Sequence, residues 1–304
     1  MTAPKVLIIY YSQTGQLATL AQQFAAPLQQ AGITVDCVPL VPQQSYPFPW
    51  RFWHFFDTFP ESAHLRPAPI EPPQIPHHDY DAVVIAYTVW FLAPAQPITA
   101  FLQREDTRRL LAGKPVITLI GCRNMWLSAQ EKMKTLLAAN GARLIGNIVK
   151  TDACGTAASF VTTPAWLLSG DKRYFKNLPA AGIAEAELAD GARFGVKLRD
   201  ALLSDTPLDE TLFQHMGAAR VDEKLIFSEK AASRSFYLWG RLLMAAGRVS
   251  PLLRRVLLAC YIVFLITLIL TVIPISIMLK KLLHPLLKNR LAEAKRYYAL
   301  PSGE

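Results

Sequence analysis

The stretch Lys5–Gln16 reads KVLIIYYSQTGQ, a short apolar run that ends directly in Ser, Thr and Gly residues. A continuous apolar run of this length is typical of a strand buried on both faces, and we place that strand at Lys5–Tyr11. The following residues, Leu17–Gln30, carry apolar side chains at helical spacing and stop at Gly32. The start of the chain therefore predicts a strand, a polar loop and a helix, in that order.

The same alternation continues through the first 200 residues. Apolar runs predict four further strands, at Thr34–Pro39, Ala82–Tyr87, Val116–Cys122 and Arg143–Val149. Helical spacing predicts further helices at Ala95–Leu111, Leu127–Asn140 and Glu185–Leu203. Strands that alternate with helices imply a parallel sheet with helices on both faces. The expected fold class is α/β, with a doubly wound sheet of five parallel strands.

The net charge of +9 belongs to the end of the chain. Residues 1–219 contain 18 Lys+Arg and 18 Asp+Glu, whereas residues 220–304 contain 14 and 5. This distribution disfavours a uniformly basic, nucleic-acid-binding domain, and we expect no nucleic-acid partner. The four cysteines have no CxxC spacing and no paired His, so we expect no metal site and a reducing compartment.

An uncharged run of 24 residues, 256–279, is long enough to cross a bilayer. A buried core helix is the alternative, which the flanking pairs Arg254-Arg255 and Lys280-Lys281 disfavour. We expect a single-pass C-terminal anchor in the inner (cytoplasmic) membrane, with the N-terminal domain in the cytoplasm and residues 280–304 as a basic tail. A helical hairpin in which the chain turns back at Pro274 is a further alternative.

Upstream of this run, residues 233–244 predict an amphipathic helix within a basic linker, 206–255. Arginines recur every seven residues, at positions 234, 241, 248 and 255, and aromatic and Leu residues fill much of the rest. A basic helix with aromatic residues suits the headgroup region of an anionic leaflet. Packing of the helix on the N-terminal domain is the alternative.

Two long insertions interrupt the strands and helices of the domain expected at residues 1–205. The first, at about residues 40–80, is rich in Pro and places eight aromatic residues between Tyr46 and Phe59. It is too aromatic for solvated disorder, and it could cover an apolar site, enter the membrane or form a small core of its own. The second insertion, 151–184, carries Trp166, Tyr174 and Phe175.

The loop Ser12-Gln13-Thr14-Gly15-Gln16 lies between the first strand and its helix. Hydroxyl groups and a glycine at a helix N-terminus provide donors and a positive dipole end for a phosphate group, although an ordinary Ser/Thr N-cap uses the same residues. Ligands of open parallel sheets lie at the carboxyl ends of the strands. There the third strand is followed by Thr88-Val89-Trp90-Phe91, and the fourth ends in Gly121-Cys122-Arg123-Asn124-Met125-Trp126.

The first strand with Ser12-x-Thr14-Gly15 resembles the FMN phosphate loop of the flavodoxin-like superfamily. Leu17 stands where that loop usually closes with a second Thr, and Trp90 stands where those proteins often place a ring-stacking aromatic residue. The resemblance implies strand order 2-1-3-4-5 and an FMN site. The implied cofactor-binding residues are Ser12, Gln13, Thr14, Gly15, Gln16, Thr88, Trp90, Phe91, Gly121, Cys122, Arg123, Asn124 and Trp126.

Several stretches resemble, more narrowly, the flavodoxin-like proteins of dialkylresorcinol biosynthesis, called dialkylresorcinol condensing enzymes or aromatases. The C-terminal apolar segment is one of them, and the others are Tyr10–Leu17, Pro47–Trp50, Phe59–Ser62, Trp90–Leu92, Pro115–Trp126 and Arg193–Gly195. This resemblance implies an FMN-dependent oxidoreductase that aromatises a lipophilic alkyl or aryl cyclohexane-1,3-dione, made by a partner ketosynthase, to a dialkylresorcinol.

Two other functions fit the same features. One is a membrane-tethered NAD(P)H-quinone reductase or electron carrier, and the other is a non-redox membrane scaffold for a lipid-biosynthetic partner. The sequence identifies no catalytic base, although Tyr46 and His54 lie in the aromatic insertion.

Overall fold

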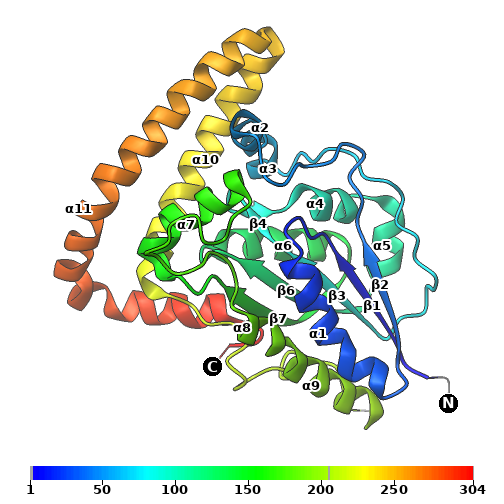
Figure 1. The fold of residues 1–304 in the computed structure, drawn as a ribbon. Coiled ribbons are helices and arrows are strands. Elements are labelled where there is room, and N and C mark those ends of the chain that lie inside the picture. Colours follow the sequence, from blue (N-terminus) through cyan, green and yellow to red (C-terminus); the bar gives the residue numbers. More distant parts are fainter. Residues whose placement is uncertain (1–2, 205, 304) are drawn as a thin grey trace.

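The computed structural model describes residues 3–204 and 206–303, with the backbone alone for residues 156–157 and 272–286. Its centre is a five-stranded parallel sheet in the order β2-β1-β3-β6-β7 (Figure 1). The strands are β1 (Lys5–Tyr10), β2 (Thr34–Pro39), β3 (Ala82–Tyr87), β6 (Pro115–Cys122) and β7 (Arg143–Thr151). All five predicted strands are thus present and parallel.

Alternate residues of each strand enter two separate cores, one on each face of the sheet. Val6 and Ile8 of β1 pack with α1 (Gln16–Gln30) and α9 (Gly191–Leu203), and Leu7 and Ile9 pack on the opposite face. That face is covered by α4 (Gln96–Leu102), α5 (Glu105–Leu111) and α6 (Leu127–Ala139). Burial of both faces explains why the strands read as continuous apolar runs.

Two helices expected to be continuous are interrupted. The predicted helix 95–111 divides into α4 and α5 because Arg104 is extended and binds the carboxylate of Asp106, which also accepts a hydrogen bond from the amide of Thr107. The predicted helix 185–203 divides at Asp190 into α8 (Glu185–Ala189) and α9.

The aromatic insertion folds into two short helices, α2 (Phe52–Asp57) and α3 (Phe59–Ala63), and Gln96 of α4 binds it to the sheet domain. Gln96 Nε2 donates to the Thr58 carbonyl oxygen and to Ser62 Oγ, at 3.2 and 3.0 Å. Gln96 Oε1 accepts from the Tyr46 hydroxyl at 2.8 Å. The insertion is therefore an ordered part of the domain.

The second insertion contains α7 (Gly155–Ser169), and a two-stranded ribbon follows β3. The strands of the ribbon are β4 (Val89–Trp90) and β5 (Ala93–Pro94). Its turn residues, Phe91 and Leu92, have φ values of 49° and 59°. These left-handed conformations are costly for residues with a Cβ atom, and such strain is concentrated at functional sites.

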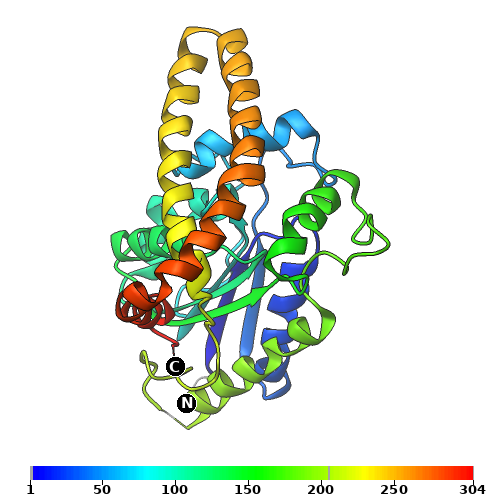
Figure 2. The same cartoon turned by 90° about the vertical axis from the view of Figure 1, so that its left-hand side faces the viewer.

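Two long helices, α10 (Glu223–Val249) and α11 (Pro251–Ala299), follow the sheet domain. They run in opposite directions on one face of the molecule, and α11 leans away from α10 before its last part bends back to the domain (Figures 1 and 2). The predicted amphipathic helix 233–244 is the middle of α10. Within α11, the segment Pro251–Thr271 is long and apolar enough to cross a membrane, with a mean hydropathy of 2.3, and little of it is buried. The side chains at Pro274, Lys280 and Lys281 lie outside those described.

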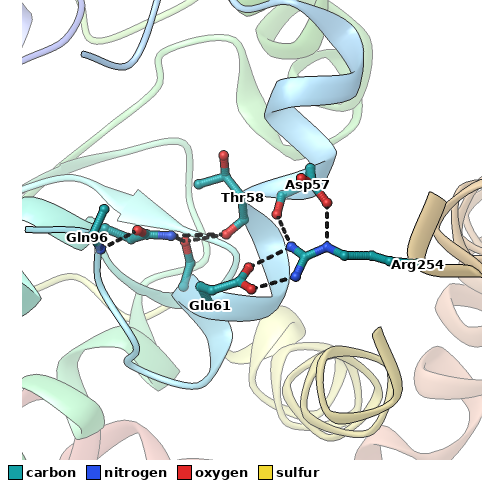
Figure 3. Close-up of polar contacts among 7 residues, drawn as sticks. Asp57, Thr58, Glu61, Gln96 and Arg254 are labelled. Carbon is teal, nitrogen blue, oxygen red and sulfur yellow. Dashed lines mark hydrogen bonds and ion pairs between the residues drawn. The ribbon is translucent and has the colours of Figure 1, made fainter. Parts of the chain in front are cut away.

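Both ends of α11 contact the sheet domain. Near its N-terminus, the Arg254 guanidinium forms a bidentate ion pair with Glu61, at 2.7 and 2.9 Å, and a further ion pair with Asp57 at 2.7 Å (Figure 3). Beyond its C-terminal end, Ser302 Oγ accepts a hydrogen bond from the amide of Asn147 in β7. In this arrangement α11 does not place its two ends on opposite sides of a membrane, as a single-pass anchor would.

Candidate functional site

A cavity of about 320 Å³ lies at the carboxyl ends of the parallel strands. Its floor comes from the loops after β1, β3, β6 and β7. Its remaining walls come from the aromatic insertion, from α7 and from α10. The volume is in the range of small-molecule sites, which are mostly apolar clefts with a few polar groups.

The cavity brings together ten of the thirteen residues predicted to bind a cofactor. These residues are Ser12, Gln13, Thr14, Gln16, Thr88, Trp90, Phe91, Gly121, Cys122 and Arg123. They come from three segments at strand ends, and the first and last of them, Ser12 and Arg123, are 111 residues apart in sequence.

The other three predicted residues, Gly15, Asn124 and Trp126, are not among those that line the cavity. Gly15 is the left-handed residue that precedes α1, with a φ of 85°. Asn124 lies in the β6–α6 loop, and Trp126 is buried in the core below that loop. Trp126 therefore contributes to the packing of the core and does not line the cavity.

Several lining residues were not anticipated from the sequence. Asp152 directly follows β7, and the expectation that ligands bind at the carboxyl ends of the strands therefore applies to it as well. Its carboxylate accepts hydrogen bonds from Thr163 Oγ1 of α7 and from the amides of Cys154 and Gly182, at 2.8–3.0 Å. Asp152 therefore fixes the second insertion at the edge of the cavity. Ala232 and Phe236 of α10 also line the cavity, and no local sequence signal indicates them.

The loop after β1 leaves polar groups available at the N-terminus of α1. Ser12 Oγ accepts a hydrogen bond from the amide of Ala18 at 3.1 Å, so the hydroxyl proton can still be donated to a ligand. Gly15 gives α1 no side-chain cap, and the first amides of a helix have no partner within the helix. This geometry suits an anion.

The two glutamines of this loop use their side chains to hold the insertions. Gln13 donates to the Pro47 carbonyl oxygen and accepts from Trp50 Nε1, both at 3.0 Å. Gln16 donates to the carbonyl oxygen of Ile183 at 2.8 Å and accepts from its amide at 3.1 Å. Their side chains are therefore occupied, and only their backbone amides remain for a ligand.

Arg123 lines the cavity without a carboxylate partner among the described residues. Its guanidinium lies 4.2 Å from the ring centre of Phe160, and Nη2 lies 3.6 Å from the sulfur of Met125. Burial lowers the pKa of Arg123, an effect that Cys122 and Asp152 partly offset. A partly desolvated cation without an ion pair is unfavourable, and it indicates a place for an anionic or electron-rich ligand group.

Asn124, the next residue in this loop, has a buried side-chain amide in which neither the nitrogen nor the oxygen has a hydrogen-bond partner among the described residues. Buried amides are almost always hydrogen-bonded, so an exception needs an explanation. The amide has both a donor and an acceptor, but Asn124 does not line the cavity, so neither atom faces a ligand there.

A cluster of aromatic rings forms one wall of the cavity. Trp90 makes edge contacts with Tyr11, Tyr46 and Trp50, with ring centres 4.8–5.8 Å apart. Such contacts add to the stabilisation from burial and hold Trp90 in place. The wall is therefore rigid and apolar.

The groups considered as a base are poorly placed. Burial, followed by the nearby charge of Glu61, raises the pKa of Tyr46 to about 12, and its hydroxyl donates to Gln96. His54 is exposed and is not among the residues that line the cavity. Burial also raises the pKa of the Cys122 thiol, which therefore stays protonated.

Glu229 of α10 is a buried carboxyl group one helical turn before Ala232, which lines the cavity. Its Oε1 accepts from the amide of Ser128 at 2.6 Å, and its Oε2 has no partner among the described residues. Burial raises the pKa of Glu229 to about 7, although the hydrogen bonds at the start of α6 oppose the shift. The folded protein therefore holds a proton here that the unfolded chain would release.

Replacement of Glu229 by Gln should remove the part of the pH dependence of the free energy of unfolding that comes from this carboxyl group. Between about pH 4.5 and 7 the folded protein binds more protons at this site than the unfolded chain, so wild-type stability should fall as pH rises through this window. At about pH 8 the Glu229→Gln variant should be more stable by up to about 3 kcal/mol, and the two proteins should converge near pH 5. Urea unfolding at several pH values measures this, with exposed Glu210→Gln as the control. Parallel profiles for Glu229→Gln and wild type would contradict the expectation.

The strand order and the cavity at the strand ends together define a flavodoxin-like α/β fold. No protein-family model and no curated protein sequence matches the chain.

Solved structures similar to the chain include a flavoprotein from Lactobacillus acidophilus NCFM in complex with FMN. It has a TM-score of 0.40 and 19% identity, over 48% of this chain and 93% of that one. A flavone reductase has a TM-score of 0.38 and 13% identity, over 67% of this chain and 65% of that one. General stress protein 14 from Treponema denticola, in complex with FMN, has a TM-score of 0.33 and 10% identity, over 66% of this chain and 99% of that one.

Proposed function

We propose that the cavity binds FMN and that the protein is an FMN-dependent oxidoreductase. The observation that carries this proposal is Arg123, a guanidinium without a carboxylate partner among the described residues, in a cavity that also contains the N-terminus of α1. Ser12, Thr14 and the first amides of α1 would hold the phosphate group, and Arg123 would hold the polar edge of the ring. Trp90 and Phe91 would contact the ring faces.

The proposed substrate is a lipophilic ring, an alkyl or aryl cyclohexane-1,3-dione that is aromatised to a dialkylresorcinol. The bound flavin would supply the two-electron oxidation. The chain's own contribution would be an aromatic wall that excludes water, and Arg123, which would favour negative charge near the ring. The sequence resemblance to the dialkylresorcinol aromatases and the mostly apolar cavity support this substrate class.

We further propose that the protein acts at the inner membrane with the sheet domain in the cytoplasm, beside a ketosynthase that supplies the substrate. The apolar segment of α11 and the four free cysteines support this location. Ala232 and Phe236 line the cavity from α10, whose neighbouring Tyr237 and Leu238 are exposed. A lipophilic substrate could therefore approach along this helix.

Loss of the Thr14 hydroxyl tests the phosphate site. Thr14→Val should weaken FMN binding about 10- to 100-fold, the effect of one hydrogen bond to a charged group. Gly15→Leu should also weaken it, because a side chain at φ 85° is strained. Titration of FMN fluorescence measures both, and circular dichroism checks folding. Thr135→Val, on the exposed face of α6, is the matched control. Unchanged affinity in both loop variants would remove the phosphate-loop assignment.

The substrate class is tested by anaerobic mixing of the FMN-loaded protein with an alkyl cyclohexane-1,3-dione. Loss of the oxidised-flavin absorption with formation of a resorcinol supports the aromatase. Flavin reduction by NAD(P)H without reaction of the dione would instead support a quinone reductase or electron carrier. Failure to retain any flavin would favour the scaffold.

A further inference from the structure

The outward face of α11 is apolar over its first half. Val256, Cys260, Val263, Thr267 and Leu270 follow one another at spacings of three and four residues, and all are exposed. Leu258, Tyr261 and Ile262 of the same helix are buried against α10 and the aromatic insertion. A helix that faces water carries polar residues on its outer face. No charged residue lies between positions 256 and 271, so water is a poor environment for this face.

The threonines of this face do not need water as a hydrogen-bond partner. Thr267 Oγ1 donates to the carbonyl oxygen of Val263 at 2.9 Å, and Thr271 Oγ1 donates to that of Thr267 at 2.7 Å. Polar groups in an apolar medium must be satisfied within the protein. The outward face of α11 meets this requirement at both positions.

The neighbouring helix α10 carries a row of arginines on its exposed side. Arg234, Arg241 and Arg248 recur every seven residues, are exposed, and form no ion pair with a described residue. Leu238 and Leu242 are exposed between them. Altogether α10 and α11 hold thirteen of the 23 large hydrophobic side chains that are exposed among the described residues. Cationic side chains beside an apolar surface are typical of contact with an anionic leaflet.

We propose that α10 and α11 attach the protein to one leaflet of an anionic bilayer, with α11 lying in the plane of the membrane and not crossing it. Both ends of α11 stay with the sheet domain through Arg254 and Ser302. Trp53 of α2 is exposed beside the start of α11, since the Arg255 guanidinium lies 5.9 Å from the centre of its ring. A two-fold interface between copies is disfavoured, because the arginine rows of both copies would lie in it without acidic partners.

Depth measurements distinguish an in-plane helix from a spanning helix. Val256→Cys, Val263→Cys and Leu270→Cys, each combined with Cys260→Ser and labelled with an environment-sensitive fluorophore, cover about 21 Å of α11. On vesicles of phosphatidylcholine and phosphatidylglycerol, quenching by brominated lipids should give the same shallow depth, about 5–10 Å, at all three positions. A depth that changes steadily along the helix would show a span. Absence of quenching with a dimer in solution would show self-association. Either result overturns the proposal.

The arginine row is tested by lipid composition. The triple variant Arg234→Gln, Arg241→Gln and Arg248→Gln should bind vesicles containing phosphatidylglycerol about 100-fold more weakly than the wild type. This is the effect expected when the attraction of three cations to an anionic leaflet is lost. Its binding to pure phosphatidylcholine should be unchanged. The control replaces Arg108, Arg109 and Lys197, exposed cations of α5 and α9, by Gln. Equal losses in the two triple variants would contradict a specific headgroup contact.

Discussion

The Arg123→Met variant is expected to change ligand affinity and stability in opposite directions. Without ligand, the variant should be as stable as the wild type or more stable, because a partly buried cation without a carboxylate partner is replaced by an apolar side chain of similar length. FMN binding should weaken about 10- to 100-fold, the effect of one charge-assisted hydrogen bond. Urea unfolding of the apoprotein and fluorescence titration with FMN measure the two effects.

Arg193→Met is the control for the removal of a guanidinium. Arg193 is also stacked on an aromatic ring, that of Phe194, but it has an ion pair with Asp190 and is not among the residues that line the cavity. It should leave FMN affinity unchanged. If Arg123→Met destabilised the apoprotein and left affinity unchanged, the role of Arg123 would be structural, through Phe160 and Met125.

The Gly195→Ala variant should lose much of the stability of the sheet domain. A Cβ atom at this position of α9 would meet the Phe24 carbonyl oxygen of α1 far inside contact distance, and Pro27 Cγ at 2.8 Å. Backbone cannot move aside as a side chain can, so the two helices would have to separate. We expect a loss of about 3 kcal/mol or more, which lowers Tm by about 10 °C.

Gly191→Ala, one turn earlier in α9, is the matched control. There the nearest atom is the flexible end of the Leu20 side chain, at 2.8 Å, and Ala also favours the helix. Its effect on Tm should be much smaller than that of Gly195→Ala. Similar losses in both variants would show that any added volume between α1 and α9 is disruptive, and would contradict a special role for Gly195.

The sheet was predictable because each strand is a continuous apolar run bounded by turn residues. Glycines with positive φ, such as Gly32 and Gly141, end helices close to where the sequence indicated. The two broken helices were not predictable, because the apolar pattern continues across Arg104 and Asp190 while local ion pairs and hydrogen bonds interrupt the backbone.

The candidate site was predictable to the extent that ligands of open parallel sheets bind at the carboxyl ends of the strands. That rule placed Ser12, Thr88 and Gly121 at one edge, and the cavity contains all three. It did not reveal that the side chains of Gln13 and Gln16 bind the two insertions, because these hydrogen bonds join residues 34 and 167 positions apart. It also did not reveal that Phe236 of α10 forms a wall of the cavity. Local periodicity carries no information about such pairs.

The most direct test of the flavin proposal is a titration of the purified full-length protein with FMN, followed by the absorption spectrum of the complex. The proposal predicts saturable binding of one FMN per chain, with a perturbed flavin spectrum that Thr14→Val and Arg123→Met weaken. A well-folded protein that binds no FMN, or binds it equally well in both variants, would contradict the assignment of this cavity as a flavin site.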